Sequence, residues 1–223
     1  MSFFTRQPSE ADQTDRRQRM IKTQLEKRDI TDPLVLKALG TVPRHRFVLE
    51  SDLDIAYGDH PISIGCGQTI SQPYIVASMT QHLELNESSR VLEIGTGCGY
   101  QTAVLAEICA HVYTIEYIPE LSREAEARLK DLGYRNVTAM VGDGSLGWAE
   151  YAPFDGIIVT AAAPKIPPTL ETQLAANGKM LIPITLSGGS QVLVDARRTS
   201  EGLEKKRLYS VRFVPMLGVI DKL

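Results

Sequence analysis

Cysteine is scarce in this sequence: the 223 residues include only Cys66, Cys98 and Cys109, and no two of them form a C-x-x-C pair. An odd, scattered set argues against a disulfide framework and a zinc site, so we expect no bound metal. Long hydrophobic runs are also missing, and the first 17 residues lack the apolar segment of a secretion signal. These absences favour a cytoplasmic protein in a reducing compartment, without a membrane partner.

A charge excess of either sign is missing too. The chain has 24 lysine and arginine residues against 27 aspartate and glutamate residues, which gives a net charge of −3. A nucleic-acid-binding surface usually shows as a basic excess, so we expect no nucleic-acid partner. The length and the hydrophobic content of 43% are typical of one soluble globular domain, which we expect to be a monomer.

The sequence divides into a tail, an extension and a core. Residues 1–12 are polar and are expected to form a flexible tail. The remainder, 13–223, is expected to form a single domain. Within it, residues 13–72 should form a helical and irregular N-terminal extension, and residues 73–223 an α/β core that binds the ligand.

Two helices are expected in the extension. Met20, Ile21 and Leu25 fall on one helical stripe. The segment 32–40 reads DPLVLKALG, in which the aspartate can cap a helix, the proline suits its first position and the glycine can end it. Residues 42–69 show no regular pattern.

Strand-like and helix-like patterns alternate from Pro73 onward, and this rhythm favours a parallel sheet covered on both faces. Residues 190–216 instead predict two antiparallel strands around a turn at 200–202. The expected fold class is α/β: a Rossmann-like, doubly wound, mostly parallel seven-stranded sheet with a C-terminal antiparallel hairpin and an N-terminal helical extension. The expected strands of the alternating part are 90–95, 111–117, 136–142, 154–163 and 179–185, with helices that begin at 73, end near 109, and cover 121–134 and 167–177.

A glycine loop follows the first of these strands in VLEIGTGCGYQTAVLA, residues 91–106. Gly95, Gly97 and Gly99 could serve only the dihedral angles of a tight turn, or they could let a ligand approach bare backbone beside a helix N-terminus. Their G-x-G-x-G spacing differs from the G-x-G-x-x-G of dinucleotide-binding folds, which disfavours an NAD-dependent oxidoreductase.

Three acidic residues accompany this loop at one edge of the expected sheet. Glu93 precedes the loop, Glu116 closes the next strand, 21 positions after Gly95, and Asp143 follows the third strand. Each alone could be a solvated loop residue, but together they lie where open α/β sheets bind ligands. Acids would repel a pyrophosphate and suit a positively charged nucleoside, so S-adenosyl-L-methionine is the expected cofactor.

These motifs carry a family resemblance. E-x-G-x-G-x-G, the acid ending the second strand and GDG after the third resemble class I S-adenosylmethionine-dependent methyltransferases. GQTISQP (67–73), GDGSLGWAEYAPFDGIIVTAAAP (142–164) and RFVPMLG (212–218) are similar to the protein-L-isoaspartate (D-aspartate) O-methyltransferase family. The resemblance implies an enzyme that methylates the carboxylate of L-isoaspartyl residues in damaged proteins and peptides, with D-aspartyl residues left open as a second acceptor. The methyl ester would collapse to a succinimide and so initiate repair.

The resemblance also assigns roles at the expected site. It makes Ser71 the active-site residue, whose hydroxyl would aim the acceptor carboxylate without acting as a nucleophile. The alternative for Ser71 is a helix cap, because it lies just before a helix that starts with proline. Cofactor contacts are expected from Ile70, Gln72, Glu93, Gly95, Gly97, Gly99, Glu116, Asp143 and Gly144, and substrate contacts from Thr69, Ser71, Ala161, Ala162 and Val214.

No general base can be assigned to this site. The segment 160–164, TAAAP, is aprotic apart from its threonine, and no histidine follows an expected strand end. A carboxylate acceptor is already ionised at neutral pH and needs no base, so the site matches one. Arg44 and Arg46 could help hold a carboxylate but are interpreted as surface residues, and His45 as a surface or hydrogen-bonding residue. The remaining alternatives are a methyltransferase for a small carboxylate or another acceptor, and a module that binds the cofactor without turnover.

Overall fold

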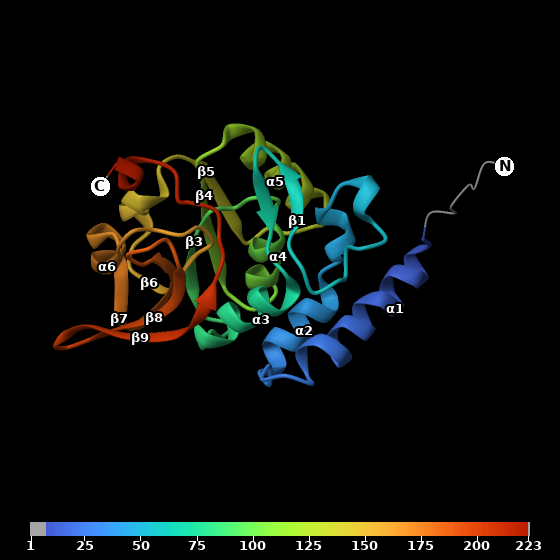
Figure 1. The fold of residues 1–223 in the computed structure, drawn as a ribbon, viewed down its shortest axis with the longest axis horizontal. Helices are drawn as coiled ribbons and strands as arrows, with labels where there is room; N and C mark the ends of the chain where they lie inside the picture. The colour runs from blue at the N-terminus through green and yellow to red at the C-terminus, as the bar shows by residue number, and fades with distance from the viewer. Residues whose placement is uncertain (1–7, 223) are drawn as a thin grey trace.

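The structure is a computed structural model that describes residues 8–222. Its centre is a seven-stranded sheet in the order β5-β4-β3-β6-β7-β8-β9 (Figure 1). The pairs from β5 to β7 are parallel, while β7-β8 and β8-β9 are antiparallel, so the predicted fold class is confirmed. The strands are β3 (Arg90–Ile94), β4 (His111–Glu116), β5 (Val137–Val141), β6 (Phe154–Val159), β7 (Leu174–Thr185), β8 (Gln191–Thr199) and β9 (Gly202–Val211).

Both faces of the sheet are covered by other elements. Successive side chains of a strand point to opposite faces, so neighbouring residues pack into different hydrophobic clusters. In β3, Val91 packs into the cluster that includes the N-terminal helices, and Leu92 packs into a second cluster. Ile158 and Ile157 of β6 divide between the clusters in the same way. The helices are α1 (Glu10–Met20), α2 (Pro33–Thr41), α3 (Pro73–His82), α4 (Tyr100–Ala106), α5 (Pro119–Asp131) and α6 (Pro168–Gln173).

The first helix begins earlier than the sequence indicated. The Ser9 hydroxyl accepts a hydrogen bond from the Asp12 N–H, and the Asp12 carboxylate accepts one from the Ser9 N–H at 2.9 Å. This reciprocal cap makes residues 10–12 helical, so the predicted tail is wrong for these three residues. Residues 1–7 of that tail lie outside the described residues. After α1 the chain continues as a π-helical segment, Ile21–Leu25, which contacts α2.

The second helix has the cap that its sequence predicts. Oδ1 of Asp32 accepts hydrogen bonds from the N–H groups of Leu34 at 2.8 Å and Val35 at 3.4 Å. The helix ends at Thr41 and not at Gly40, so the predicted stop is one residue early.

A hairpin in the predicted irregular part was missed. β1 (Ile62–Gly65) and β2 (Gln68–Ile70) pair antiparallel. Their connection has positive φ angles at Gly65 (87°), Cys66 (51°) and Gly67 (70°), which is unusual for the cysteine. Two strands this short leave little alternation in the sequence, so periodicity alone does not reveal them.

The helix predicted over 167–177 is shorter than expected. α6 ends at Gln173, and Leu174 already pairs with Phe154 as the first residue of β7. The fourth strand also ends early, at Val159, and beyond it Ala163 forms only an isolated bridge with Ile184 of β7.

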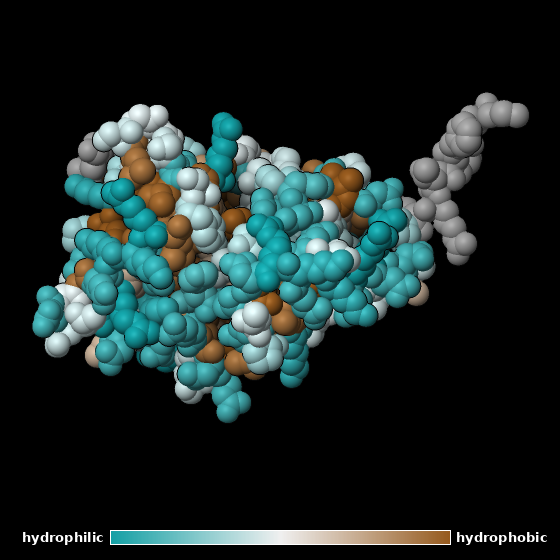
Figure 2. All heavy atoms as spheres, turned by 60° about the horizontal axis from the view of Figure 1, so that its bottom comes forward, coloured by the Kyte–Doolittle hydropathy of each residue, from teal (hydrophilic) through white to brown (hydrophobic). Residues whose placement is uncertain are grey.

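The surface and the helices carry two further findings. None of the helices within residues 8–222 combines the length and the hydropathy needed to cross a membrane. Figure 2 shows a mainly hydrophilic face on which hydrophobic residues form small, separate areas.

All three cysteines have free thiols; Cys66 is exposed, and Cys98 and Cys109 are buried.

Candidate active site

Two hollows meet at the carboxyl edge of the parallel strands. The inner pocket lies against the loop after β3 and the end of β4. The outer groove lies beside it, between the start of α3 and the end of β9. The inner pocket is lined by residues within 68–79, 94–101, 115–118, 160–161 and 213–217 and by Gly144, and the outer groove by Arg28, Pro61, Thr69, Ser71, Gln72, Tyr74, Ile75, Thr160 and 209–214.

The glycine loop forms one wall of the inner pocket. Gly95 and Gly97 line the pocket with φ angles of 95° and 55°, and the hydroxyl of Thr160 donates a hydrogen bond of 2.7 Å to the Gly95 carbonyl. Gly99 does not line it, and the cofactor contact expected of Gly99 stays a prediction. A Cβ on Gly99 would lie 3.3 Å from Leu129, so this glycine serves its φ of 89° and the packing of α4 on α5.

Glu116 supplies the one charged side chain among the described residues that line the inner pocket. Its Oε2 accepts a hydrogen bond from the Gly97 N–H at 2.8 Å, and its Oε1 accepts one from the Ile118 N–H at 2.9 Å. Each carboxylate oxygen can accept a further bond. A pocket wall with a carboxylate and no lysine, arginine or histidine favours a ligand that is cationic or rich in hydroxyl groups over one with phosphates.

Glu93 does not line the inner pocket, and the cofactor contact expected of it stays a prediction. Its side chain is fully buried between β4 and α4, where one oxygen accepts hydrogen bonds from the hydroxyls of Thr102 at 2.5 Å and Thr114 at 2.7 Å. Burial, with a smaller contribution from Glu116, raises the pKa of Glu93 to about 8. The carboxyl group therefore joins β3 to β4 and α4 behind the glycine loop's strand.

Asp143 is also directed elsewhere, and its neighbour lines the pocket. Burial raises the pKa of Asp143, but hydrogen bonds from the Val219 N–H at 2.7 Å and from the hydroxyl and N–H of Ser145 outweigh it and hold the pKa below its ordinary value. Gly144 faces the inner pocket, and a Cβ there would collide with Ile94. The Asp143 carboxylate is thus bonded to Ser145 and Val219, and the cofactor contact expected of Asp143 stays a prediction.

Ser71 lies where the two hollows join. The residue before Pro73, the first residue of α3, is Gln72, and no side chain caps this helix, so the alternative of Ser71 as a capping residue is wrong. Ile70 lines the inner pocket as predicted, whereas Gln72 lines only the outer groove. The residues shared by both hollows are Thr69, Ser71, Ile75, Thr160, Phe213 and Val214.

The residues predicted to contact the substrate divide into two groups. Ala161 lines the inner pocket, and Val214 lines both hollows. Ala162 is buried and its backbone is engaged, because its N–H donates to the Val214 carbonyl and its carbonyl accepts from the Met216 N–H, both at 2.8 Å. Ala162 therefore positions the segment around Val214, and the substrate contact expected of it stays a prediction.

Arg44 was misread as a surface residue. Its side chain is fully buried; Nε donates to the Ala56 carbonyl and Nη2 to the Ser71 carbonyl, both at 2.8 Å. No sequence signal could have found this role, because the acceptors are backbone groups 12 and 27 residues away. Arg46 is exposed as expected and forms an ion pair of 2.8 Å with Asp131.

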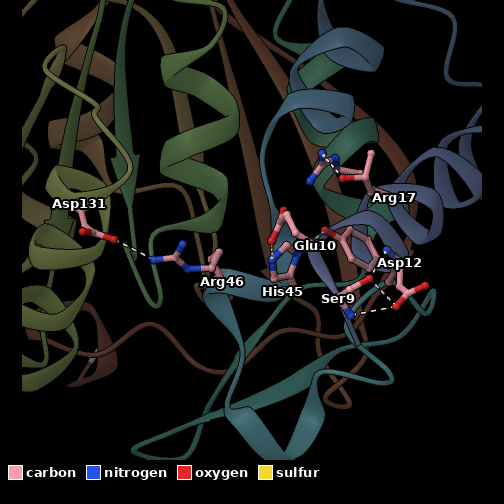
Figure 3. A network of polar contacts seen from close by, with 9 residues as sticks. Ser9, Glu10, Asp12, Arg17, His45, Arg46 and Asp131 are labelled. Carbon is pink, nitrogen blue, oxygen red and sulfur yellow. Dashed lines mark hydrogen bonds and ion pairs between the residues drawn. The ribbon is translucent and has the colours of Figure 1, made fainter. Parts of the chain in front are cut away.

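His45 anchors the same segment to the first helix. Its Nδ1 lies 2.8 Å from the Tyr57 hydroxyl and its Nε2 lies 3.3 Å from the Glu10 carboxylate. Figure 3 shows His45 turned toward Glu10, while Arg46 extends away toward Asp131. Burial lowers the pKa of His45, so the neutral imidazole serves as a structural hydrogen-bonding group. This confirms the hydrogen-bonding interpretation over the surface one.

Several known proteins are similar to this chain over most of its length. A family model described as protein-L-isoaspartate(D-aspartate) O-methyltransferase matches residues 15–220. A protein-L-isoaspartate O-methyltransferase of Picosynechococcus is 54% identical over 202 residues, which cover 91% of this chain and 90% of the relative. A protein-L-isoaspartate O-methyltransferase 2 of Pelobacter propionicus is 51% identical over 212 residues, which cover 95% and 94%.

Two solved structures of similar proteins superpose on this chain. One structure of a protein-L-isoaspartate O-methyltransferase superposes with a TM-score of 0.85 at 30% identity and covers 92% of this chain and 67% of its own. A Plasmodium falciparum structure described as such an enzyme in complex with S-adenosyl-L-homocysteine gives a TM-score of 0.78 at 28% identity, covering 90% and 98%. The match extends from the N-terminal helices to the segment around Val214, so this chain belongs to the protein-L-isoaspartate(D-aspartate) O-methyltransferase family.

Proposed function

We propose that this chain transfers a methyl group from S-adenosyl-L-methionine to the free carboxylate of L-isoaspartyl residues in proteins and peptides. The observation that carries this proposal is the position of Ser71, between a pocket with a single carboxylate and a groove that follows the extended segment 209–214. The names of relatives with about half of their residues identical support it. D-Aspartyl residues are proposed as a second acceptor.

The inner pocket fits the cofactor by its donor set. S-adenosyl-L-methionine supplies, when bound, a methyl group activated by a sulfonium centre. Glu116 would accept hydrogen bonds from the ribose hydroxyls, and the bare backbone at Gly95 and Gly97 would allow close approach. The described lining residues include no lysine, arginine or histidine, so no positively charged side chain of the pocket would repel the cationic end of the cofactor.

The acceptor side fits a carboxylate. The described lining residues of the inner pocket include no histidine that could remove a proton, and an ionised carboxylate has none to lose. The Thr160 hydroxyl is already bonded to the Gly95 carbonyl. This leaves the hydroxyl of Ser71, which has no recorded partner, to donate a hydrogen bond to one acceptor oxygen while the other oxygen faces the methyl group.

The product of this step explains the biological role that we propose. Methylation turns the free carboxylate of the isoaspartyl residue into an ester with a better leaving group. Attack by the neighbouring backbone nitrogen then expels methanol and forms a succinimide. Water opens the succinimide in part to a normal aspartyl residue, so repeated cycles repair the damaged chain.

The proposed function is tested with matched peptides. The protein is incubated with methyl-labelled S-adenosyl-L-methionine and either an isoaspartyl peptide, its aspartyl twin or its D-aspartyl twin. We expect label in the isoaspartyl peptide and none in the aspartyl peptide. Label in both of these peptides, or in small carboxylic acids but neither peptide, would overturn the proposal in favour of another acceptor. Cofactor binding without any label transfer would identify a non-catalytic module.

We further propose that the protein works in the cytoplasm as a monomer. Its free thiols suit a reducing compartment, and the face in Figure 2 is mainly hydrophilic. In the proposed domain organisation, residues 13–72 supply Ser71 and one side of the inner pocket, and residues 73–223 supply the glycine loop and Glu116. Light scattering during gel filtration tests the monomer, because a dimer would double the measured mass.

A further inference from the structure

Arg44 holds the segment that carries Ser71. It lies in a short 3₁₀ helix, Arg44–Phe47, that follows α2. Its guanidinium donates one hydrogen bond to the Ala56 carbonyl and one to the Ser71 carbonyl. The bond from Arg44 is the one hydrogen bond that the structure records for Ser71 within residues 8–222.

The charge of Arg44 is costly where it lies. The side chain is fully buried, and no carboxylate within the described chain pairs with it. Taking a cation out of water without a counter-ion costs several kcal/mol even after relaxation. Two carbonyl acceptors and a ring, that of Tyr100 at 4.7 Å, offset part of this cost. An apolar side chain could fill the same space beneath the site. Packing alone therefore does not explain why an arginine occupies this position.

The surroundings connect Arg44 to the inner pocket. Tyr100, whose ring lies beside the guanidinium, lines that pocket. Nη1 of Arg44 and the hydroxyl of Tyr100 are both buried and have no other hydrogen-bond partner among the described residues, and the two side chains interact with each other. The residue after Ser71 is Gln72, which precedes Pro73; a residue before proline is restricted to extended backbone. A clamp on the Ser71 carbonyl and a stiff following residue together leave the Ser71 backbone little freedom.

We propose that Arg44 is a positioning residue for methyl transfer, which fixes the Ser71 backbone so that the serine hydroxyl points to the acceptor carboxylate. The inference rests on the proposed function of Ser71. The planar guanidinium spans two carbonyls 15 positions apart in the sequence, Ala56 and Ser71, with two separate N–H groups. A lysine has a single ammonium group and cannot reproduce that fork, so Arg44→Lys keeps the charge and loses the alignment.

A double-mutant cycle separates positioning from general support. Wild type, Arg44→Lys, Ser71→Ala and the double variant are compared by kcat/KM on an isoaspartyl peptide, cofactor affinity and Tm. We expect Arg44→Lys to lower kcat/KM by about tenfold to a hundredfold, the usual cost of misplacement near the reacting atoms. In the Ser71→Ala background the same change should cost less than about threefold, because the group it positions is gone. Cofactor affinity should change by less than about threefold in either single variant.

Arg46→Lys is the matched control. It changes the same residue type two positions away, where the guanidinium is exposed and bonded to Asp131, and should leave kcat/KM unchanged. Fully additive losses for Arg44→Lys and Ser71→Ala would overturn the proposal and leave Arg44 as a supporting residue. A wild type that does not methylate the isoaspartyl peptide would instead overturn the proposed function, so the two failures are distinct.

A measurement on the wild type covers the case in which Arg44→Lys does not fold. Arg44 is the one fully buried arginine of the described chain, so in arginine-labelled protein its Nε proton should exchange with water most slowly. With S-adenosyl-L-homocysteine present, the isoaspartyl peptide should shift this resonance, and its aspartyl twin should not. The absence of a shift at saturating isoaspartyl peptide would show that binding of the acceptor does not affect the Ser71 segment, and would overturn the proposal.

Discussion

The backbone N–H of Gly97 donates a hydrogen bond of 2.8 Å to the carboxylate of Glu116. This bond joins the loop after β3 to the end of β4, so one carboxylate both shapes the glycine loop and faces the inner pocket. Because the same group does both, the loop and the cofactor contact should fail together when it is removed.

Replacing Glu116 by alanine should weaken S-adenosyl-L-methionine binding by about 1.5–3 kcal/mol, the usual contribution of hydrogen bonds to a charged group. Titration calorimetry on the purified variant measures this. Glu126→Ala, an exposed change on α5, is the control and should bind like the wild type. Unchanged affinity in a folded Glu116→Ala variant would remove Glu116 from the cofactor site.

Gly97→Val should abolish cofactor binding with a smaller effect on folding. The φ of 55° strains any residue with a Cβ, and the new Cβ would lie 3.3 Å from Ile64 in β1. Gly188→Val is the matched control, because Gly188 has a φ of 96° and no neighbouring atom within 4 Å of an added Cβ. Equal loss of binding in both variants would indicate general strain. Normal binding by Gly97→Val would show that the glycine loop serves only as a turn and does not contact the cofactor.

Ser71→Ala should lower kcat/KM on an isoaspartyl peptide by about tenfold to a hundredfold, or roughly 1.5–3 kcal/mol of lost hydrogen bonding to a charged acceptor. Residual activity should remain, because the hydroxyl orients the acceptor and does not attack it. No covalent enzyme intermediate should be trapped in the wild type.

The stability of Ser71→Ala should be close to that of the wild type, since no capping bond is lost. Asp32→Ala provides the contrast: it removes a real cap of α2 and should cost about 1 kcal/mol of folding free energy while activity is retained. Thermal melts and kcat/KM values of both variants distinguish a catalytic role of Ser71 from a capping role. A lowered Tm with intact turnover for Ser71→Ala would make the catalytic assignment wrong.

Glu93→Gln should change how stability depends on pH. Burial raises the pKa of Glu93 to about 8, whereas the unfolded chain releases this proton near pH 4.5. Between these values the folded state binds more protons, so the contribution of Glu93 is complete below pH 4.5 and is lost as the pH rises toward 8. Glutamine holds no such proton, so its stability relative to the wild type should rise from pH 5 to pH 8.

Urea unfolding of both proteins at several pH values measures this difference, and other titrating groups such as His45 cancel in it. Cofactor affinity should change by less than about threefold, since Glu93 does not line the inner pocket. A stability difference that is constant across this range would mean that the Glu93 carboxyl is ionised in the folded protein.

Much of the fold could be predicted because its signals are local. The alternating patterns and the glycine spacing place β3, α4 and β4, and the Asp32 cap is present as its sequence suggests. The direction of the Glu93 side chain could not be predicted, because it depends on which residues of other elements surround it. Pairing of β3 with β4 places Glu93 beside Thr114, and packing of α4 brings Thr102 to the same carboxyl group.

The candidate site shows the same limit. Ser71, Gly95 and Glu116 lie in motifs that the sequence displays, and the structure brings all three to one pocket. Arg44 lies in VPRHRF, whose neighbouring basic residues make it look solvated. Its burial depends on backbone carbonyls that only the folded chain assembles.

The order of elements along the chain sets the order in which the site can come into existence during synthesis. Gly95, Glu116 and Gly144 are made before four of the seven strands of the main sheet are complete. Residues 213–217, which line the inner pocket, and residues 209–214, which line the outer groove, lie in β9 or after it. A nascent chain therefore completes both hollows at the same late step, and truncation before β9 should abolish cofactor binding together with acceptor binding.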